Sequence, residues 1–397
     1  MPGPLEGVRV LDLTRVLAGP YCTMMLADLG AEVVKVEVPG TGDDSRGFGP
    51  FKDGKSLYYI TINRGKQSVA LDLKKEEGRS LLLKLVRKSD ILVENFRPGT
   101  MEKLGLGWEV LKKENPRLIY AAVSGFGHSG PDSKKPAYDI LVQARGGMMS
   151  ITGWPNSPPT RVGMSTGDIT AALFGSSGIL AALYQREKTG KGQKVDVAML
   201  DCQVAILENA LVRYQVDGKA PGALGTRHPT ITPFQAFRAS DAWFVVAVGN
   251  DSLWKTFCEA LDRPDLLADS RFATNGDRTR NIADLIPELE RVFTRRKAQE
   301  WIDLLEGAGV PSSPVNAVDR VMQDPQLIAR NMLVTVQDPQ VGAVTVPGNP
   351  IKMESLAESK TRPGAPEIGQ DTEKVLIEVL GLSAGEIEAL RASGALG

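Results

Sequence analysis

The chain has 397 residues, of which 42% are hydrophobic and 24% charged, and its formal net charge is −1. At about 150 residues per domain this length suggests two to three domains, and the composition excludes disordered, collagen-like and fibrous classes. The balanced charge excludes a global field for nucleic acid or an anionic membrane, so an anionic ligand needs a local group of cations.

Alternating strands and helices are predicted over the first 125 residues. The strands are expected at 8–13, 32–37, 67–71, 90–94 and 117–124, and the helices at 21–29, 75–88 and 100–113. A strand, a helix and a second strand within the first forty residues form a βαβ unit, which implies a parallel sheet with right-handed crossovers. The sequence therefore predicts a doubly wound α/β layer of the nucleotide-binding type.

A long helix rich in Ala, Gly and Ser is predicted at 167–186, and its small side chains favour close packing. Residues 217–233 are rich in Gly, Pro and Thr, which predicts a linker into a small α+β domain. Further elements are a strand from 194, a helix at 200–214, a hairpin over 236–249, helices at 251–262, 280–293 and 297–307, and a hairpin at 333–348. A last helix begins at Ser383 with a capping-box spacing to Glu386. The predicted segments are 1–216, 217–325 and 326–397.

Few residues of the reactive types are present: three scattered cysteines and two histidines, His128 and His228. The cysteines predict no disulfide framework and suit a reducing cytoplasm, and the sequence predicts neither a signal peptide nor a membrane span. We expect a cytoplasmic protein whose histidines are loop or hydrogen-bonding residues. The sequence contains neither a zinc-binding motif nor a GxSxG motif. If the protein is an enzyme, we therefore expect its reactive group to be a carboxylate, a lysine or a bound cofactor.

A literal GxGxxG motif runs from Gly125 to Gly130, directly after a predicted strand. A dinucleotide site requires a helix to open at once, so that its N-terminal amides meet the pyrophosphate. Here Pro131 and Pro136 flank a predicted loop where such a site would require a helix. We interpret the motif as a glycine-permitted loop.

Asp168 follows Gly167 at the start of the predicted long helix. The simplest interpretation is an N-cap whose carboxylate accepts the first free N–H groups. The functional interpretation is a nucleophile whose anion is favoured by the helix dipole, with the glycine allowing a substrate to approach closely. The two interpretations are compatible.

Basic residues near the ends of the predicted strands could together bind an anionic ligand, although each alone is interpreted as a solvated charge. They are Arg15, Lys35, Lys74, Lys75, Arg97 and Lys103. In VENFRPG, Asn95, Phe96 and Arg97 directly follow a strand. An aromatic face and an amide beside an arginine suit a ligand that carries a nucleotide.

Four segments of the sequence carry a resemblance to a known family, in the same order and with the same spacing as in that family. They are RVLAGPYCTMMLADLGAEVVKVE, VENFRPGT, PAYDI and GDITAALFGSSGILAALYQREKTGKGQKVDVAMLD. They resemble the type III CoA-transferases, the family of formyl-CoA and carnitine CoA-transferases. The resemblance covers nearly the whole chain. It implies a Rossmann-like large domain built from both chain ends, a smaller α+β domain and an interlocked homodimer.

The resemblance also implies roles for particular residues. Asp168 matches the catalytic aspartate of the family. The positions that match the CoA site are Val16, Ala18, Leu71, Asp72, Leu73, Lys74, Asn95, Phe96, Arg97, Lys103 and Tyr138. CoA or acyl-CoA would then be a substrate rather than a permanently bound cofactor, a small carboxylic acid would be the second substrate, and no metal is implied.

The sequence departs from the formyl-CoA enzymes at three places. Leu17 stands where they carry Gln, Val38 stands where they carry a phosphate-binding Arg, and Gly249-Asn-Asp replaces their glycine-rich loop. These departures predict that formyl-CoA and oxalate are poor substrates. Residues 225–233 look closer to members that act on dicarboxylates such as succinate and glutarate, with succinyl-CoA as an expected donor. Arg227, Arg238 or an arginine of the partner chain could bind the second carboxylate.

A sister branch, the 2-methylacyl-CoA racemases, is the alternative. Those enzymes use a His-Asp pair, but here Tyr138 occupies the position before Asp139 and Ile140. A tyrosine, with a reference pKa of about 10, is no ready base near neutral pH. The sequence therefore favours transfer, in which Asp168 forms a mixed anhydride with the donor acyl group and then a thioester with CoA.

Overall fold

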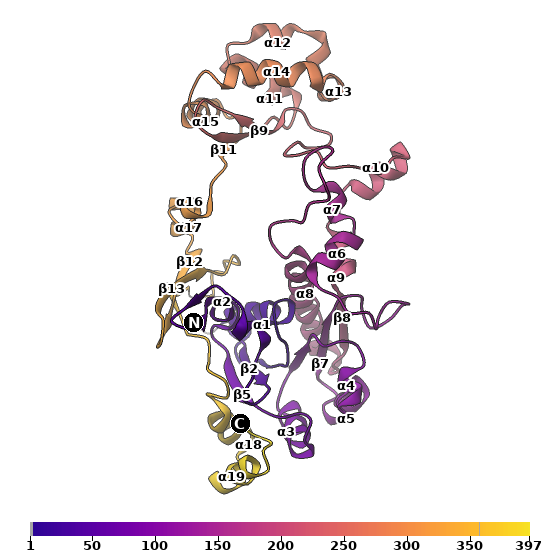
Figure 1. Ribbon diagram of the computed structural model, residues 1–397, viewed down its shortest axis with the longest axis vertical. Coiled ribbons are helices and arrows are strands. Elements are labelled where there is room, and N and C mark those ends of the chain that lie inside the picture. The colour runs from indigo at the N-terminus through magenta and orange to yellow at the C-terminus, as the bar shows by residue number, and fades with distance from the viewer. Residues whose placement is uncertain (1–2, 357) are drawn as a thin grey trace. The chain divides into compact units, whose positions relative to one another are not determined.

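The computed structural model describes residues 3–356 and 358–397. It contains a six-stranded parallel sheet in the order β5-β2-β1-β6-β7-β8 (Figure 1). The strands are β1 (Arg9–Asp12), β2 (Glu32–Glu37), β5 (Gln67–Ala70), β6 (Ile91–Glu94), β7 (Ile119–Ser124) and β8 (Lys194–Ala198). The strand order reverses between β1 and β6, and ligands bind open α/β sheets at such a switch point.

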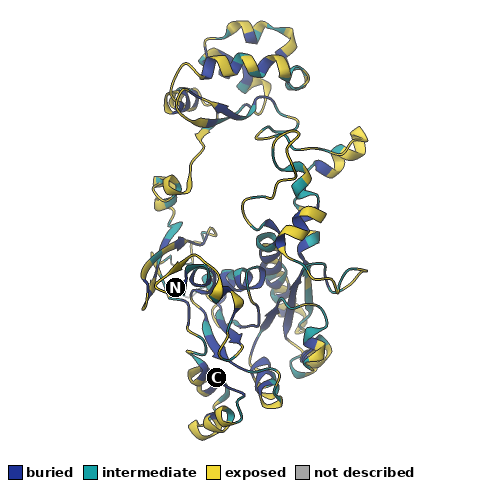
Figure 2. Ribbon diagram, viewed as in Figure 1, coloured by how far each residue is buried: buried dark blue, intermediate teal, exposed yellow. Residues whose placement is uncertain are grey.

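Most residues of β5, β2, β1, β6 and β7 are buried, as in parallel sheets that are covered on both faces, whereas the edge strand β8 is only partly buried. Val10 pairs with Val33 and Ile91 in one row of the sheet, and all three lie in one core cluster. The adjacent Leu11 points into the other core cluster. Figure 2 shows most of the central strands in the colour of buried residues. The predicted doubly wound α/β layer is confirmed.

Helices cover both faces of the sheet. On the face of Val10 lie α1 (Ala18–Asp28) and α8 (Thr166–Thr189), and on the face of Leu11 lie α3 (Glu76–Val86) and α5 (Trp108–Glu114). By length and composition, α8 is the one described helix that could cross a membrane. Its Ala172, Ile179 and Ala182 are instead buried in the core cluster on the Val10 face of the sheet.

The C-terminal segment returns to the sheet beside β5. There Leu71 forms an isolated bridge with Leu396, and the Ser68 backbone N–H donates to Asp371 Oδ2 at 2.9 Å. Val375 and Leu376 of α18 (Thr372–Leu380) complete the core cluster on this face. The last helix, α19 (Ala384–Ala392), begins with the predicted capping box of Ser383 and Glu386.

The described chain divides into two compact units. The first comprises 1–149, 161–216 and 325–397, and the second 150–160 and 217–324. The remaining elements of the first unit are β3 (Phe51–Lys52), β4 (Lys55–Ser56), α2 (Leu57–Asn63), α4 (Thr100–Lys103), α6 (Asp139–Arg145), α9 (Met199–Ala205), α10 (Ala210–Asp217), α17 (Pro325–Ala329), β12 (Leu333–Asp338), β13 (Gly342–Pro347) and β14 (Thr361–Arg362). Two further short helices are η1 (Asp44–Gly47), in the first unit, and α7 (Met148–Ile151), within which the chain passes from the first unit to the second.

The second unit is a small α+β layer of its own. Its antiparallel sheet has the order β11-β10-β9, and an aromatic core forms around Phe293, whose ring lies 4.9 Å from that of Phe237. Its elements are β9 (Phe234–Arg238), β10 (Trp243–Ala247), α11 (Asp251–Ala260), α12 (Pro264–Ala268), η2 (Ser270–Phe272), α13 (Asn275–Arg280), α14 (Ile282–Phe293), α15 (Ala298–Gly307), β11 (Ser312–Pro314) and α16 (Val318–Val321).

Two predicted helices are wrong in extent. The helix expected at 100–113 is two helices, α4 and α5, because Gly105 adopts a φ of +72° between them. The helix expected at 200–214 is likewise α9 and α10, with Glu208 at a φ of +55° in the break. The short helices α2 and α6 and the C-terminal α18 were not predicted.

Candidate active site

A cleft of about 220 Å³ lies where the sheet order reverses, at the carboxyl ends of β1, β6 and β7. All of its lining comes from the first compact unit. The lining residues are Arg15, Val16, Leu17, Ala18, Asp44, Asn95, Phe96, Arg97, Pro98, Val123, Ser124, Gly125, Lys135, Ala137, Tyr138, Asp139, Asp168 and Met199. Carboxylate, amide, aromatic and guanidinium groups therefore meet on one cavity.

Asp168 lines this cleft from the first turn of α8. The N-cap interpretation is wrong, because the helix begins at Thr166 and Ser165 occupies the cap position. Asp168 is the third residue of the helix. Its carboxylate has no hydrogen bond or ion pair within residues 3–356 and 358–397. The side chain is therefore free to face a ligand in the cleft.

The surroundings of Asp168 disfavour its ionised form. Burial and the nearby Asp139 carboxylate raise the pKa of Asp168 to about 7, although Arg161 lowers the pKa in part. The expectation that the helix dipole favours the anion is therefore outweighed by burial and like charge. A carboxyl group with a raised pKa in a cleft is typical of a functional site.

Asp139 fixes the start of α8. Its Oδ1 accepts a hydrogen bond from the Gly167 N–H at 2.8 Å, and its Oδ2 accepts one from Gln143 Nε2 at 2.8 Å. The Arg161 guanidinium forms an ion pair with Oδ2 at 3.1 Å. A Cβ on Gly167 would lie 2.5 Å from Val142, so this glycine serves the contact between α8 and α6 rather than the approach of a substrate.

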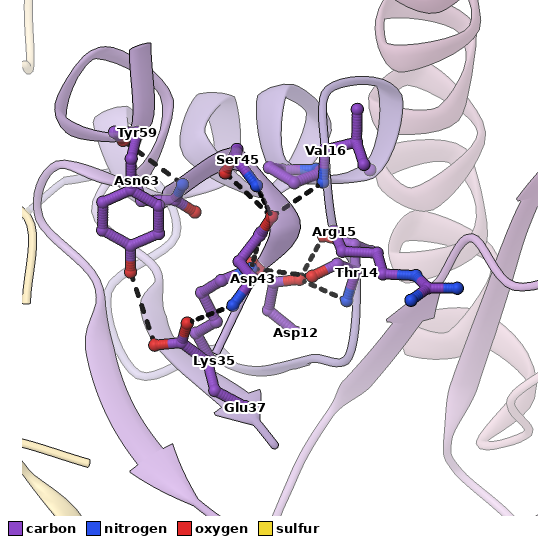
Figure 3. A network of polar contacts seen from close by, with 12 residues as sticks. Asp12, Thr14, Arg15, Val16, Lys35, Glu37, Asp43, Ser45, Tyr59 and Asn63 are labelled. Carbon is purple, nitrogen blue, oxygen red and sulfur yellow. Dashed lines mark hydrogen bonds and ion pairs between the residues drawn. The ribbon is translucent and has the colours of Figure 1, made fainter. Parts of the chain in front are cut away.

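The loop after β1 is held from below by buried charges (Figure 3). The Val16 N–H donates to Asp43 Oδ1 at 3.0 Å, and Lys35 Nζ lies 2.8 Å from Asp43 Oδ2. Lys35 also donates to the Thr14 carbonyl at 2.7 Å. Burial acts to raise the pKa of Asp43, but the Lys35 charge and its hydrogen bond hold that pKa below the ordinary value.

This network maintains a strained residue at the edge of the cleft. Val16 has a φ of +71°, a region that costs a β-branched residue on the order of 1–2 kcal/mol. Lys35 is fully buried beneath it, so the expectation that Lys35 helps to bind an anionic ligand is wrong. Its charge is used to hold Asp43 in place.

The loop after β6 is joined to the loop after β1. The Arg15 N–H donates to Asn95 Oδ1 at 2.9 Å, and Asn95 Nδ2 donates back to the Arg15 carbonyl at 2.7 Å. The Arg15 guanidinium lies 5.7 Å from the centre of the Phe96 ring. The reciprocal hydrogen bonds fix the spacing of the two loops across the switch point.

The cleft brings together eight of the residues predicted to bind a ligand or to react: Arg15, Val16, Ala18, Asn95, Phe96, Arg97, Tyr138 and Asp168. Lys103 and the segment 71–74 lie outside its lining, and Leu71 is buried in the core. Lys75 donates to the Ser393 carbonyl, so its ammonium group is used within the fold. Both histidines are loop residues, since His128 donates to Asp196 through its N–H and His228 to the Phe234 carbonyl.

Sequence reasoning missed several residues of the cleft. Asp44, Lys135, Asp139 and Met199 line it without having been proposed for the site. Tyr58 of α2, which does not line the cleft but interacts electrostatically with Asp168, was missed as well. Burial and the charges of Asp168, Asp43 and Asp139 raise the pKa of Tyr58 to about 12, which keeps the hydroxyl protonated. These residues converge from distant parts of the chain, and no local motif marks them.

Within residues 3–356 and 358–397, no group of three or more His, Cys, Asp or Glu residues is placed to hold a metal ion. The chemistry that these residues themselves can perform is that of a carboxylate nucleophile. The same cleft lining contains neutral hydrogen-bond donors, among them Asn95 and Tyr138, and the cations Arg15, Arg97 and Lys135.

Comparison with known proteins gives consistent matches over almost the whole chain. The sequence profile of CoA-transferase family III matches residues 5–372. The chain is 47% identical over 369 residues to the acetyl-CoA:oxalate CoA-transferase of Acetobacter aceti, which covers 93% of this chain and 94% of that protein. It is 40% identical over 392 residues to the human succinyl-CoA:glutarate CoA-transferase, covering 98% of this chain and 89% of that protein.

A solved structure matches in the same way. A CAIB/BAIF family protein from Brucella suis superposes with a TM-score of 0.83 at 38% sequence identity, covering 96% of this chain and 100% of that chain. The predicted resemblance is confirmed in sequence and in fold.

Proposed function

Because this chain belongs to CoA-transferase family III and is thereby an enzyme that transfers CoA between an acyl-CoA and a carboxylic acid, we propose that Asp168 is its covalent nucleophile. The single observation that carries this proposal is the geometry of Asp168. Its carboxylate lines the cleft at the switch point and has no partner among the described residues, while Asp139 holds the first turn of its helix.

The proposed exchange is balanced without an external acid or oxidant. The Asp168 carboxylate attacks the thioester carbonyl of the donor, so that an anhydride forms and CoA thiolate leaves. The thiolate then attacks the aspartyl carbonyl, which gives an aspartyl-CoA thioester and releases the donor acid. The acceptor carboxylate repeats these two steps in reverse, and the new acyl-CoA leaves Asp168 as a free carboxylate.

Two neighbours of Asp168 support this chemistry. The N-terminus of α1 borders the cleft at Leu17 and Ala18, and the first N–H groups of a helix have no partners within it. We assign them to the oxyanion that forms in each tetrahedral intermediate. Tyr58 is protonated at neutral pH and interacts electrostatically with Asp168, so its hydroxyl is suited to donate to the same region.

The remaining cleft residues are proposed to bind CoA. Asn95, Phe96 and Arg97 offer an amide, an aromatic face and a cation to the nucleotide portion, while Val16, Ala18 and Tyr138 border the path to Asp168. Leu71, Asp72, Leu73, Lys74 and Lys103, which lie outside the lining, stay predictions from the resemblance. Arg15, which stacks beside Phe96, is added to the set.

For substrates we propose a short dicarboxylate acceptor with succinyl-CoA as donor. Relatives at 40% and 42% identity are named for succinyl-CoA with glutarate and with mesaconate. The relative at 47% identity is named for acetyl-CoA and oxalate. Oxalate therefore belongs in the acceptor panel, despite the departures at Leu17 and Val38. Neither histidine lines the described cleft, and this supports transfer over 2-methylacyl-CoA racemisation.

We also propose that the chain acts as a homodimer. Large apolar side chains are exposed on α8 at Leu173, Phe174 and Tyr184 and on α10 at Leu211 and Val212. Apolar groups exposed along neighbouring positions of a helix suit an interface with another protein. A second copy would cover them.

Replacement of the proposed nucleophile tests the function. Asp168→Ala should lower the turnover of CoA exchange by at least about a thousandfold while CoA still binds, because no other group can carry the acyl unit. Exchange is measured by mass spectrometry with succinyl-CoA and a panel of acids. Hydroxylamine should modify Asp168 of the wild type during turnover.

The exposed Asp201 on α9 supplies the matched control, since Asp201→Ala removes a carboxylate of the same unit that does not line this cleft. This variant should keep wild-type exchange. Wild-type turnover by Asp168→Ala would reject the proposal.

A further inference from the structure

Glu94 is a buried carboxylate that the proposed reaction does not use. It is the last residue of β6 and only 1% exposed. Its Oε2 accepts a hydrogen bond from the Phe96 N–H at 2.7 Å, and its Oε1 accepts one from the Tyr120 hydroxyl at 2.8 Å. Within residues 3–356 and 358–397, no lysine or arginine lies within 4.0 Å of this carboxylate.

The hydrogen bond to Phe96 connects Glu94 to the cleft. Phe96 follows Asn95, whose side chain exchanges two hydrogen bonds with the Arg15 backbone. The next residue, Val16, is held through its N–H by Asp43. A continuous chain of contacts thus runs from the buried carboxylate through both loops that border the switch point.

Charged and titratable groups face Glu94 from four neighbouring segments. Tyr120 comes from β7, Lys194 from β8, Glu102 from α4 and His128 from the loop after β7. The pKa of Glu94 is raised to about 7: burial is the largest cause and Glu102 adds to it, while the Phe96 N–H, Tyr120 and Lys194 lower the pKa in part.

His128 leaves a buried nitrogen beside Glu94. Its Nδ1 lies 3.0 Å from Lys194 Nζ, and because an ammonium group can only donate, Nδ1 accepts and the ring proton is on Nε2. That Nε2 is buried without a hydrogen-bond partner and lies 3.6 Å from Glu94 Oε1. Burial and the Lys194 charge lower the pKa of His128, and the Asp196 and Glu102 charges raise it only in part, so the pKa stays below its ordinary value and the ring is neutral.

We propose that Glu94 is a positioning residue for CoA: its ionised carboxylate fixes the Asn95–Arg97 loop, so the affinity for CoA depends on whether Glu94 carries a proton. The inference rests on the proposed function, because it takes this loop as the CoA site. A hydrogen bond to a carboxylate is roughly twice as strong as one to a neutral acceptor. Protonation of Glu94 weakens the bond to the Phe96 N–H and loosens the loop.

The test is the affinity for dephospho-CoA between pH 5.5 and 8.5, measured by titration calorimetry. This ligand lacks the 3′-phosphate, whose second pKa of about 6 would otherwise titrate in the same range. An Asp168→Asn background removes the other carboxyl group that titrates near pH 7. In this parent protein the dissociation constant should rise about tenfold as the pH falls from 8 to 5.5, the size of one lost charge-assisted hydrogen bond.

Glu94→Gln in the same background should bind about tenfold more weakly at pH 8 and show no further pH dependence, because the amide is neutral throughout. In the otherwise wild-type enzyme, Glu94→Gln should raise the KM for acyl-CoA about tenfold and change kcat by less than about twofold. A general loss of folding would lower kcat and would not flatten the pH profile of binding.

Two surface variants complete the design. Glu102→Gln removes a like charge that faces Glu94, so the midpoint of the pH profile should move to lower pH with the affinity at pH 8 unchanged. This variant tests the proposal even if Glu94→Gln does not fold. Glu109→Gln, on the exposed side of α5, is the matched control and should leave the profile in place.

The proposal is overturned if Glu94→Gln keeps the affinity and pH dependence of the parent, or if Glu102→Gln leaves the midpoint unmoved. A wild-type enzyme that neither binds CoA nor exchanges it would instead reject the proposed function. The two failures are therefore distinct.

Discussion

Asp168 shows how a reactive residue can act against the stability of its own fold. Its carboxylate is partly buried beside Asp139, and no hydrogen bond from the described residues compensates for the lost water. Desolvated, unpaired carboxylates are costly in a folded protein. The same features leave the carboxylate oxygen atoms of Asp168 available to an acyl group. The lost stability is therefore a consequence of the proposed role as a nucleophile.

The pH dependence of stability follows from this. The ordinary pKa of 3.8 rises to about 7 in the folded state, so between these values the folded chain retains a proton that the unfolded chain has lost. The free energy of unfolding therefore falls as the pH rises through this interval. Asp168→Asn removes the effect and should be more stable than the wild type at pH 8, by about 1–2 kcal/mol after allowance for partial exposure.

Chemical denaturation at pH 5 and pH 8 measures the difference in the free energy of unfolding between Asp168→Asn and the wild type. This difference should be clearly smaller at pH 5. An equal gain at both pH values would show that Asp168 does not titrate between them.

At this scale the sequence predicted the residues that belong to contiguous motifs. Asp168, Asn95, Phe96 and Arg97 lie in segments whose order and spacing are recognisable in one dimension. Tyr58 could not be predicted, because its relation to Asp168 is made only when α2 folds beside the cleft. The burial of Lys35 was missed for the same reason: the sequence places it at a strand end, whereas its partner Asp43 lies in a later loop.

Among the elements, the loop between β1 and α1 depends most on residues outside itself. Its strained Val16 is held by Asp43, and Asp43 is in turn paired with the fully buried Lys35 (Figure 3). Removal of one partner from a buried ion pair leaves an uncompensated charge. The edge of the cleft therefore depends on a pair of charges that no solvent reaches.

Asp43→Asn should lower the free energy of unfolding by about 3 kcal/mol, since the buried Lys35 then loses its ion-pair partner and keeps only the Asp12 and Glu37 charges, while Val16 loses a charged acceptor. Urea denaturation measures the change. The adjacent Asp44→Asn is the matched control, because Asp44 pairs with Arg15 on the exposed surface and its loss should change stability by less than about 1 kcal/mol. Equal effects of the two substitutions would contradict the role given to Asp43.

Periodicity predicted the long elements and failed at their interruptions. The βαβ pattern and the hairpin of β12 and β13 are confirmed. The breaks at Gly105 and Glu208 were missed because both residues adopt a positive φ, and hydrophobic periodicity carries no signal of that local conformation. The helix α2 has the sequence LYYITIN, whose β-branched and aromatic residues favour a strand, yet Ser56 caps it as a helix.

For the whole molecule, the exposed apolar groups of α8 and α10 lead to a test of assembly. The wild type should sediment at about twice the chain mass of 42.8 kDa, because a second copy would remove Phe174 and its neighbours from water. Phe174→Glu should shift the population toward the monomer, since it would bury an unpaired charge in the interface. A wild-type protein that sediments as a monomer at micromolar concentration would contradict the proposed dimer.

The separation in sequence between β5 and the segment that covers it has a consequence for biosynthesis. The Ser68 backbone N–H donates a hydrogen bond to Asp371, which lies 303 residues later in the chain. At roughly 5–20 residues per second, a ribosome needs about 15–60 s to supply that partner. During this interval the nascent polypeptide exposes an open strand edge and an incomplete apolar surface, so chaperone engagement is expected until translation reaches α18.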